Sequence, residues 1–147
     1  MADPDVSGAI APEDRELRTL LGEAHTIAVV GLSSNPDRPS NSVARYLQDH
    51  GYRIVPVNPR ETEILGERAY PSLGDIPGDS RIDVVDVFRR AEHTPDVARE
   101  AVAIGARVLW LQQGITNDEA YQIASAGGLD VIMGVCIRTT IERLGTT

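Results

Sequence analysis

Hydrophobic positions along the chain follow two alternating periods, and this alternation predicts an α/β fold. Short runs that are almost entirely apolar have the length of strands, whereas the segments between them place apolar residues three and four positions apart, as on one face of a helix. The first helical pattern begins at Pro12 and places Leu17, Leu20 and Leu21 on one side. The predicted strands are 26–30, 52–57, 82–88, 107–111 and 129–133, and the later predicted helices are 40–50, 95–104, 117–126 and 138–144.

The order of these segments predicts how they are arranged in space. Strands without a polar face are typical of a parallel sheet that is buried on both sides, and strand–helix alternation indicates right-handed βαβ units. We therefore predict a Rossmann-like three-layer domain with about five parallel strands in the order 3-2-1-4-5 and helices on both faces. Segment 61–78 is rich in Gly and Pro, and we expect an irregular connection there with a short helical turn near Pro71.

Composition and charge set the class of the protein. The polar residues 1–11 are predicted to form a flexible N-terminal tail, and 12–147 a single domain. No apolar run reaches the ~20 residues that a membrane-spanning helix needs. The net charge of −8 argues against nucleic-acid and membrane partners, and the single cysteine, Cys136, is typical of a reducing compartment. We expect a cytoplasmic protein with a small-molecule ligand; a homodimer is compatible with this size.

The segment after the first strand contains the residues of an anion site. In an open parallel sheet, ligands bind beyond the carboxyl ends of the strands, where the strand order reverses. Gly31 allows a tight turn there, and the helix that begins at Ser40 offers free N–H groups. Ser33 and Ser34 add hydroxyl groups, and Arg38 adds a planar cation suited to phosphate oxygens. Each residue alone also has a plain structural explanation; the combination predicts phosphate binding.

The second strand narrows the choice of phosphate ligand. The turn is neither a G-x-G-x-x-G sequence nor a P-loop. An NAD site ordinarily has an acidic residue at the end of the second strand, where it binds the ribose diol. This chain has Asn58 there, followed by Arg60. These residues favour a ribose that carries a phosphate, as in NADP or coenzyme A.

Four motifs in series resemble the small stand-alone CoA-binding protein family, which is similar to the N-terminal CoA-binding domain of the succinyl-CoA synthetase α subunit. They are VVGLS at 29–33, VPVNP at 55–59, DVVDVFRR at 83–90 and WLQQGI at 110–115. The resemblance runs from about Thr26 to Leu144 and implies coenzyme A as the bound cofactor. The chain lacks the histidine of the Cys-Ile-x-x-Glu-His-like segment with which members of the family often end, and it lacks the part of the synthetase that holds the phosphorylated histidine. The resemblance therefore does not extend to synthetase activity.

The resemblance also assigns roles to residues of this chain. It implies that four residues surround the pyrophosphate, that three flank the adenosine and its phosphate, and that five line the path of the pantetheine arm or lie near it. The pyrophosphate group is Gly31, Ser33, Ser34 and Arg38, the adenosine group is Asn58, Pro59 and Arg60, and the pantetheine group is Val87, Phe88, Arg89, Gln113 and Gly114.

No arrangement of residues in the sequence indicates catalysis. Asp83 and Asp86 fall on opposite faces of the third strand, and no cluster has metal-ligand spacing. We therefore expect non-catalytic binding of CoA or acyl-CoA by a carrier, sensor or partner subunit. The alternative is a small NADP-linked reductase or a thioester-processing enzyme that uses Cys136 or His93. A cysteine after a buried strand is more often a core residue, and His93 is the better acid–base candidate.

Overall fold

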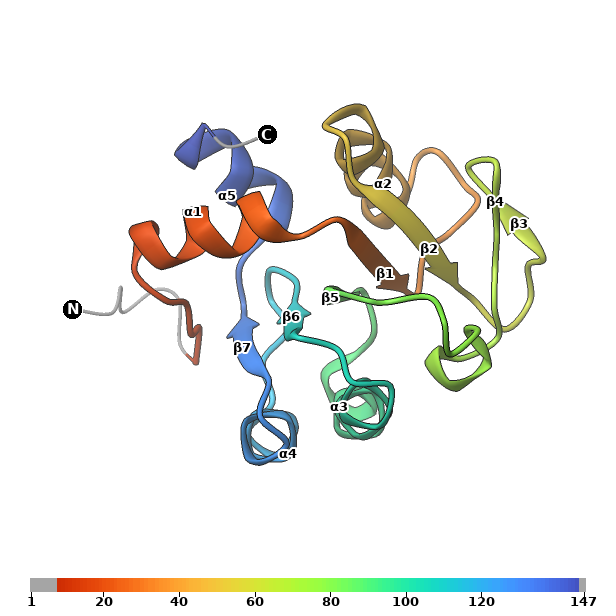
Figure 1. Ribbon diagram of the computed structural model, residues 1–147. Coiled ribbons are helices and arrows are strands. Elements are labelled where there is room, and N and C mark those ends of the chain that lie inside the picture. The colour runs from red at the N-terminus through yellow and green to blue at the C-terminus, as the bar shows by residue number, and fades with distance from the viewer. Residues whose placement is uncertain (1–7, 146–147) are drawn as a thin grey trace.

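The five apolar runs form one parallel sheet in the computed structural model, which describes residues 8–145 (Figure 1). Every strand is buried on both faces except for exposed first residues in two of them, which explains why the runs carry almost no polar positions. The fold class predicted from the sequence is confirmed. The strands are β1 (Thr26–Val30), β2 (Arg53–Val57), β5 (Val84–Val87), β6 (Val108–Leu111) and β7 (Asp130–Met133).

Helices cover both faces of the sheet and bury alternate strand residues in two cores. One core contains Ile27, Val29 and Trp110, and the other contains Ala28 and Val30. Each predicted helix is present, with ends that differ by one or two residues from the prediction. The first core is covered by α1 (Asp14–Glu23), α2 (Pro39–Asp49) and α5 (Ile137–Leu144), and the second by α3 (Thr94–Ala103), α4 (Asp118–Ala126) and the 3-10 turn η1 (Leu73–Asp75).

The predicted strand order was wrong at one position. The observed order is β2-β1-β5-β6-β7, so the third strand of this sheet, β5, lies on the free side of β1 and not outside β2. The connection that follows β2 pairs with the carboxyl end of the outer edge of β2. Tyr70 pairs there, with its N–H donating to the carbonyl of Pro56 and its carbonyl accepting from the N–H of Asn58. β5 pairs instead with the open side of β1.

The connection between β2 and β5 is irregular, as the sequence predicts, and η1 is the helical turn expected near Pro71. The sequence reading missed a two-stranded hairpin in it, formed by β3 (Glu63–Ile64) and β4 (Glu67–Arg68). The two residues that connect these strands, Leu65 and Gly66, both have positive φ angles, of 54° and 78°. Such a turn ordinarily has Asn or Asp at its first position, so Leu65 gives no turn signal.

The outer strand β7 is paired with the segment that precedes α1. Ile10 exchanges two backbone hydrogen bonds with Met133, so this part of the predicted tail is bonded to the sheet edge. The rest of the predicted tail, residues 1–7, lies outside the described residues. No helix in the described range is long and apolar enough to cross a membrane.

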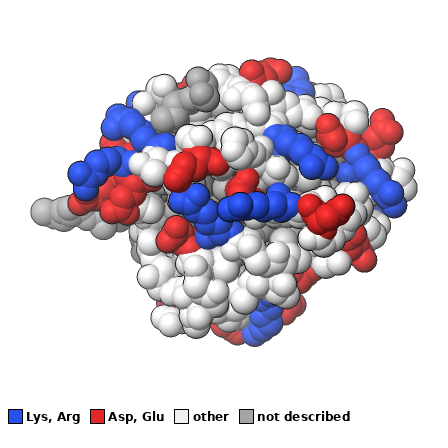
Figure 2. Space-filling view, in the orientation of Figure 1, with Lys and Arg blue, Asp and Glu red and all other residues white. Residues whose placement is uncertain are grey.

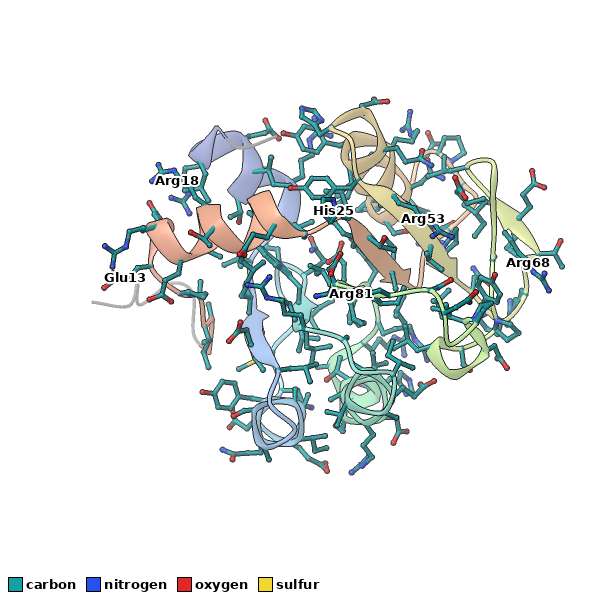
Figure 3. All side chains as sticks on the ribbon, in the orientation of Figure 1. Glu13, Arg18, His25, Arg53, Arg68 and Arg81 are labelled. Carbon is teal, nitrogen blue, oxygen red and sulfur yellow. The ribbon has the colours of Figure 1, made fainter. Side chains whose placement is uncertain are left out.

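The amino-terminal edge of the sheet carries charged residues that hold the strands together. Asp83 accepts hydrogen bonds from the backbone N–H groups of His25 and Thr26 and forms an ion pair with Arg81. His25, Arg53 and Arg81 lie along this edge, at or next to the starts of β1, β2 and β5 (Figure 3). Acidic and basic side chains are mixed across the same view of the surface (Figure 2). In open α/β sheets ligands bind at the opposite, carboxyl edge.

Candidate functional site

The carboxyl ends of β1 and β5 form the point where the strand order reverses. β1 leads into α2 on one face of the sheet, whereas β5 leads through the 3-10 turn η2 (Ala91–His93) into α3 on the other face (Figure 1). Connections that diverge in this way leave a crevice above the strand ends, which is where open α/β sheets bind ligands. The corrected order thus brings the segment after β5 directly beside the turn after β1.

Gly31 allows these two segments to touch. Its φ angle is +85°, and a Cβ atom at this position would lie 2.5 Å from the carbonyl oxygen of Phe88. Its N–H also donates to the carbonyl of Val57, over 2.9 Å. Both the backbone angle and the close approach require glycine, so the turn can pack this tightly only with this residue.

The turn after Gly31 is held by serine and asparagine side chains. The Ser33 N–H donates to Oγ of Ser40, and the Asn35 N–H donates to Oγ of Ser33. Asn41 donates from Nδ2 to the carbonyl of Ser33 over 2.8 Å. Because both hydroxyl oxygens act as acceptors in these bonds, their O–H hydrogens remain available to donate to an anion.

Arg38 stands at the N-terminus of α2, next to a small pocket. Its side chain is exposed and forms no ion pair within residues 8–145. The first turn of α2 carries no acidic residue, so the positive end of the helix dipole is not neutralised locally. We call this cavity of about 390 Å³ the turn pocket; it is lined by Gly31, Ser33, Arg38, Pro39, Ser40 and Phe88.

A second cavity, of about 520 Å³, shares Pro39 and Phe88 with the turn pocket, so the two adjoin. We call it the apolar pocket because Val43, Phe88 and Ile115 form much of its wall. Its other lining residues, apart from Pro39, are Arg89, Arg90, Gln112, Gln113 and Cys136.

The structure brings seven of the predicted site residues to these two pockets. Gly31, Ser33, Arg38 and Ser40 line the turn pocket, Arg89 and Gln113 line the apolar pocket, and Phe88 lines both.

The other predicted site residues do not line these pockets. The Ser34 hydroxyl donates to Glu61. The Asn58 amide donates to the carbonyl of Leu32 and accepts from the Arg60 N–H, so Asn58 connects the turn after β1 with the turn after β2. The Val87 side chain is fully buried in the second core. The sequence-based roles of these residues, and of Pro59, Arg60 and Gly114, stay predictions.

Several lining residues were missed or read differently. Val43 lies in the predicted helix 40–50, and Gln112 and Ile115 belong to the motif at 110–115, but the sequence predicts a binding role for none of them. Arg90 directly follows Arg89 in the same motif and could have been named with it. For Gln112 the available signal was a polar residue immediately after an apolar strand, at the edge where ligands bind.

Asp86 lies behind the apolar pocket, in the middle of β5. It is fully buried; its Oδ1 accepts from Nε2 of Gln112, and its Oδ2 has no hydrogen-bond partner among the residues that the structure describes. Burial raises the pKa of this carboxyl group to about 8, although the hydrogen bond from Gln112 lowers it. The neutral acid is therefore the form expected at pH 7.

Of the two candidates for catalysis, only Cys136 lines one of the pockets. Cys136 is half-buried at the N-terminus of α5 and lines the apolar pocket, whereas His93 is exposed and lines neither pocket. His50 ends α2, as its position before Gly51 suggests, and stacks on Tyr46. In residues 8–145 no three His, Cys, Asp or Glu side chains are grouped to hold a metal ion.

Comparison with known proteins gives a consistent set of relatives. A family model described as a CoA binding domain matches residues 25–142. The protein YneT of Bacillus subtilis is 48% identical over 127 residues, which cover 86% of this chain and 93% of YneT. A solved structure of a hypothetical protein from Pyrococcus horikoshii has a TM-score of 0.88 and 37% identity, and the match covers 98% of this chain and 99% of that one.

A longer relative is an enzyme subunit. The α subunit of the ADP-forming acetate–CoA ligase II of Pyrococcus furiosus is 37% identical over 120 residues. The match covers 76% of this chain but only 26% of the subunit, so this chain corresponds to about a quarter of that protein.

Proposed function

The chain belongs to the CoA-binding domain family, and on that premise we propose that it binds coenzyme A or an acyl-CoA, without catalysing a reaction, at the carboxyl edge of its parallel sheet. The observation that carries this proposal is the pair of adjoining pockets, one polar and one largely apolar, on either side of Phe88. Coenzyme A has the same division, with a charged nucleotide at one end and a pantetheine thiol at the other.

The turn pocket suits the pyrophosphate of this ligand. Arg38 supplies a cation that no acidic side chain within residues 8–145 neutralises, and Ser33 and Ser40 supply hydroxyl hydrogens. Charge-assisted hydrogen bonds of this kind are about twice as strong as neutral ones. Local groups of this type allow an anion to bind although the whole chain has a net charge of −8.

The remaining parts of the ligand are assigned by position. The pantetheine arm passes Phe88 and Arg89 into the apolar pocket, towards Gln113. The adenosine and its 3′-phosphate extend the other way, towards Arg60, whose side chain is exposed and forms no ion pair within residues 8–145. We infer a carrier, sensor or partner-subunit role, because the match with this chain covers only 26% of the enzyme relative. The single cysteine favours the cytoplasm as the location.

Calorimetric titration tests the proposal. The ligand-free protein is titrated with CoA, dephospho-CoA, NAD and NADP at one salt concentration. We expect micromolar binding of CoA, weaker binding of dephospho-CoA, and no comparable heat from NAD. Tight binding of NADP with no heat from CoA would overturn the proposal. The 260 nm absorbance of freshly purified protein is a rapid first check, because retained CoA carries adenine.

One observation favours a second candidate function, thioester hydrolysis or acyl transfer. Cys136 lines the pocket that would receive the thiol end of the ligand. Its thiolate could attack a thioester carbonyl, forming an S-acyl cysteine and releasing CoA thiolate, which takes up a proton. Turnover of acyl-CoA by the natural chain but not by Cys136→Ala would establish this function. Equal rates in both proteins would exclude the thiol.

A further inference from the structure

Gln112 is a polar residue held in a fixed orientation at the wall of the apolar pocket. It follows β6, and its side chain is almost completely buried although it lines the pocket. Nε2 donates to Oδ1 of Asp86, and Oε1 accepts from the backbone N–H of Ile137 over 3.4 Å. Because a backbone N–H can only donate, it determines which end of the amide faces α5 and therefore where Nε2 lies.

Within residues 8–145, this arrangement leaves one hydrogen of Gln112 without a hydrogen-bond partner. An amide nitrogen carries two hydrogens, and the bond to Asp86 uses one of them. A buried donor without an acceptor is costly, so a ligand that brings an acceptor oxygen to it gains more than a ligand that does not. The pocket therefore favours a ligand with a hydrogen-bond acceptor near Gln112.

The rest of the pocket wall indicates what surrounds that acceptor. Val43, Phe88 and Ile115 present apolar surface, and Arg89, Arg90 and Gln113 add polar groups to the wall. A free thiol is only a weak acceptor and covers little of this surface, whereas a thioester has a carbonyl oxygen with a short apolar chain attached to the same carbon. The combination of the Gln112 N–H, whose orientation is set by its partners, and the apolar side chains in the same wall matches an acyl thioester.

We propose that the apolar pocket holds the acyl group of an acyl-CoA and that Gln112 donates its second Nε2 hydrogen to the thioester carbonyl oxygen. The proposal rests on the proposed function, because the phosphates must be held in the turn pocket for the acyl group to reach this position. Asp86 acts as a positioning residue, since its carboxyl group holds the Gln112 amide from behind.

The test compares three ligands that differ only at sulfur: CoA, acetyl-CoA, and S-ethyl-CoA, which has the same two carbons but no carbonyl. Calorimetry with the full chain is expected to show acetyl-CoA binding about five- to tenfold more tightly than S-ethyl-CoA, the value of one ordinary hydrogen bond. In Gln112→Met the ratio of the two affinities is expected to fall to about one. Gln122→Met, which alters an exposed glutamine on α4, serves as the matched control and keeps the natural ratio.

The outcomes separate this proposal from the proposed function. If CoA itself does not bind, both are overturned. If CoA binds but acetyl-CoA and S-ethyl-CoA bind equally, or if Gln112→Met keeps the natural ratio, only the acyl assignment falls. If Gln112→Met fails to fold, the double variant with Asp86→Val and Gln112→Met takes its place, because it replaces both hydrogen-bonding partners by apolar groups. If the double variant also fails to fold, the ratio of the acetyl-CoA and S-ethyl-CoA affinities in the natural chain decides whether the acyl assignment stands.

Discussion

At the scale of single residues, Gly31 has the tightest constraint at the site. Its positive φ angle and the 2.5 Å approach of the Phe88 carbonyl leave no room for a side chain. We expect Gly31→Ala to lower the free energy of unfolding by about 2–4 kcal/mol, because the left-handed conformation and the displacement of the segment after β5 both add cost. Urea denaturation measures this loss. Calorimetry with CoA shows whether binding also disappears.

Gly114 provides the matched control for this substitution. It has a similar φ angle of +82°, but apart from Gly114 itself and its two chain neighbours no atom of residues 8–145 lies within 4 Å of where its Cβ would be. Gly114→Ala should therefore cost only the conformational strain, about 1–2 kcal/mol. Equal losses in the two variants would mean that the contact with Phe88 contributes nothing.

Arg38 separates binding from folding. Its side chain is exposed and lines the turn pocket, so its removal should leave the melting temperature almost unchanged. We expect Arg38→Ala to weaken CoA binding by about 1.5–3 kcal/mol, the range for a hydrogen bond to a charged group. Arg53→Ala, at the opposite edge of the sheet, is the control and should bind CoA normally. A loss of stability that matches the loss of affinity would make Arg38 a structural residue.

Residue types revealed only part of the site. Gly31 and Arg38 are predicted as site residues because they follow a buried strand at the edge of the sheet where ligands bind, and both line the turn pocket in the structure. Asn58 does not line either pocket, because its amide donates to the carbonyl of Leu32 and accepts from the Arg60 N–H. A sequence does not show which partner a short polar side chain selects, and that choice decides whether it faces a ligand.

At the scale of elements, the N-terminus of α4 is joined to the segment beside the apolar pocket. Asn117 accepts from the N–H of Ala120 as the N-cap and donates from Nδ2 to the carbonyl of Ala91 in η2. We expect Asn117→Ala to lower the free energy of unfolding by about 1–2 kcal/mol, since it removes both bonds. Chemical denaturation measures the total, and hydrogen exchange at η2 shows whether that turn loosens.

One further variant separates the cap of α4 from the hydrogen bond to Ala91, and another serves as a control. Asn117→Asp keeps the oxygen that caps α4 but loses the donor to Ala91, so its loss should be smaller. Ser125→Ala, on an exposed position of the same helix, should change stability by less than about 0.5 kcal/mol. An Asn117→Ala variant as stable as Ser125→Ala would contradict the role of the cap.

The elements themselves were predicted well, but their order in the sheet was not. Hydrophobic periodicity is a local property, so it located the five strands and five helices to within a few residues. Tyr70 pairs with the end of β2 from within an irregular segment, and β5 pairs with the other side of the β1–β2 pair. No local pattern around Tyr70 indicates that pairing.

At the scale of the whole molecule, the arginines are distributed between two roles. Arg81, Arg107 and Arg143 form ion pairs that join segments or stabilise an edge. Arg38 and the neighbouring pair Arg89 and Arg90 line the pockets and form no ion pair within residues 8–145. Unneutralised cations at one edge of an acidic protein create a local attraction for an anionic ligand, which the net charge alone conceals.

Asp86 links the stability of the whole fold to pH. Its pKa is about 8 in the folded chain against 3.8 as a free side chain. Between these values the unfolded chain binds fewer protons at this position than the folded chain does, so the contribution of Asp86 to stability is complete below about pH 4 and is lost as the pH rises towards 8. The loss amounts to about 1.4 kcal/mol for each pH unit in that interval.

Asp86→Asn isolates this effect, because the amide oxygen can still accept from Gln112 but no longer titrates. Measured by urea denaturation, the stability of Asp86→Asn relative to the natural chain should increase by about 3 kcal/mol between pH 5 and pH 7.5. An infrared band from a protonated carboxyl group should be present at pH 7 in the natural chain and absent in the variant. A stability difference that stays constant with pH would mean that Asp86 is ionised in the fold, and the unpartnered Oδ2 would then need a donor that the described residues do not provide.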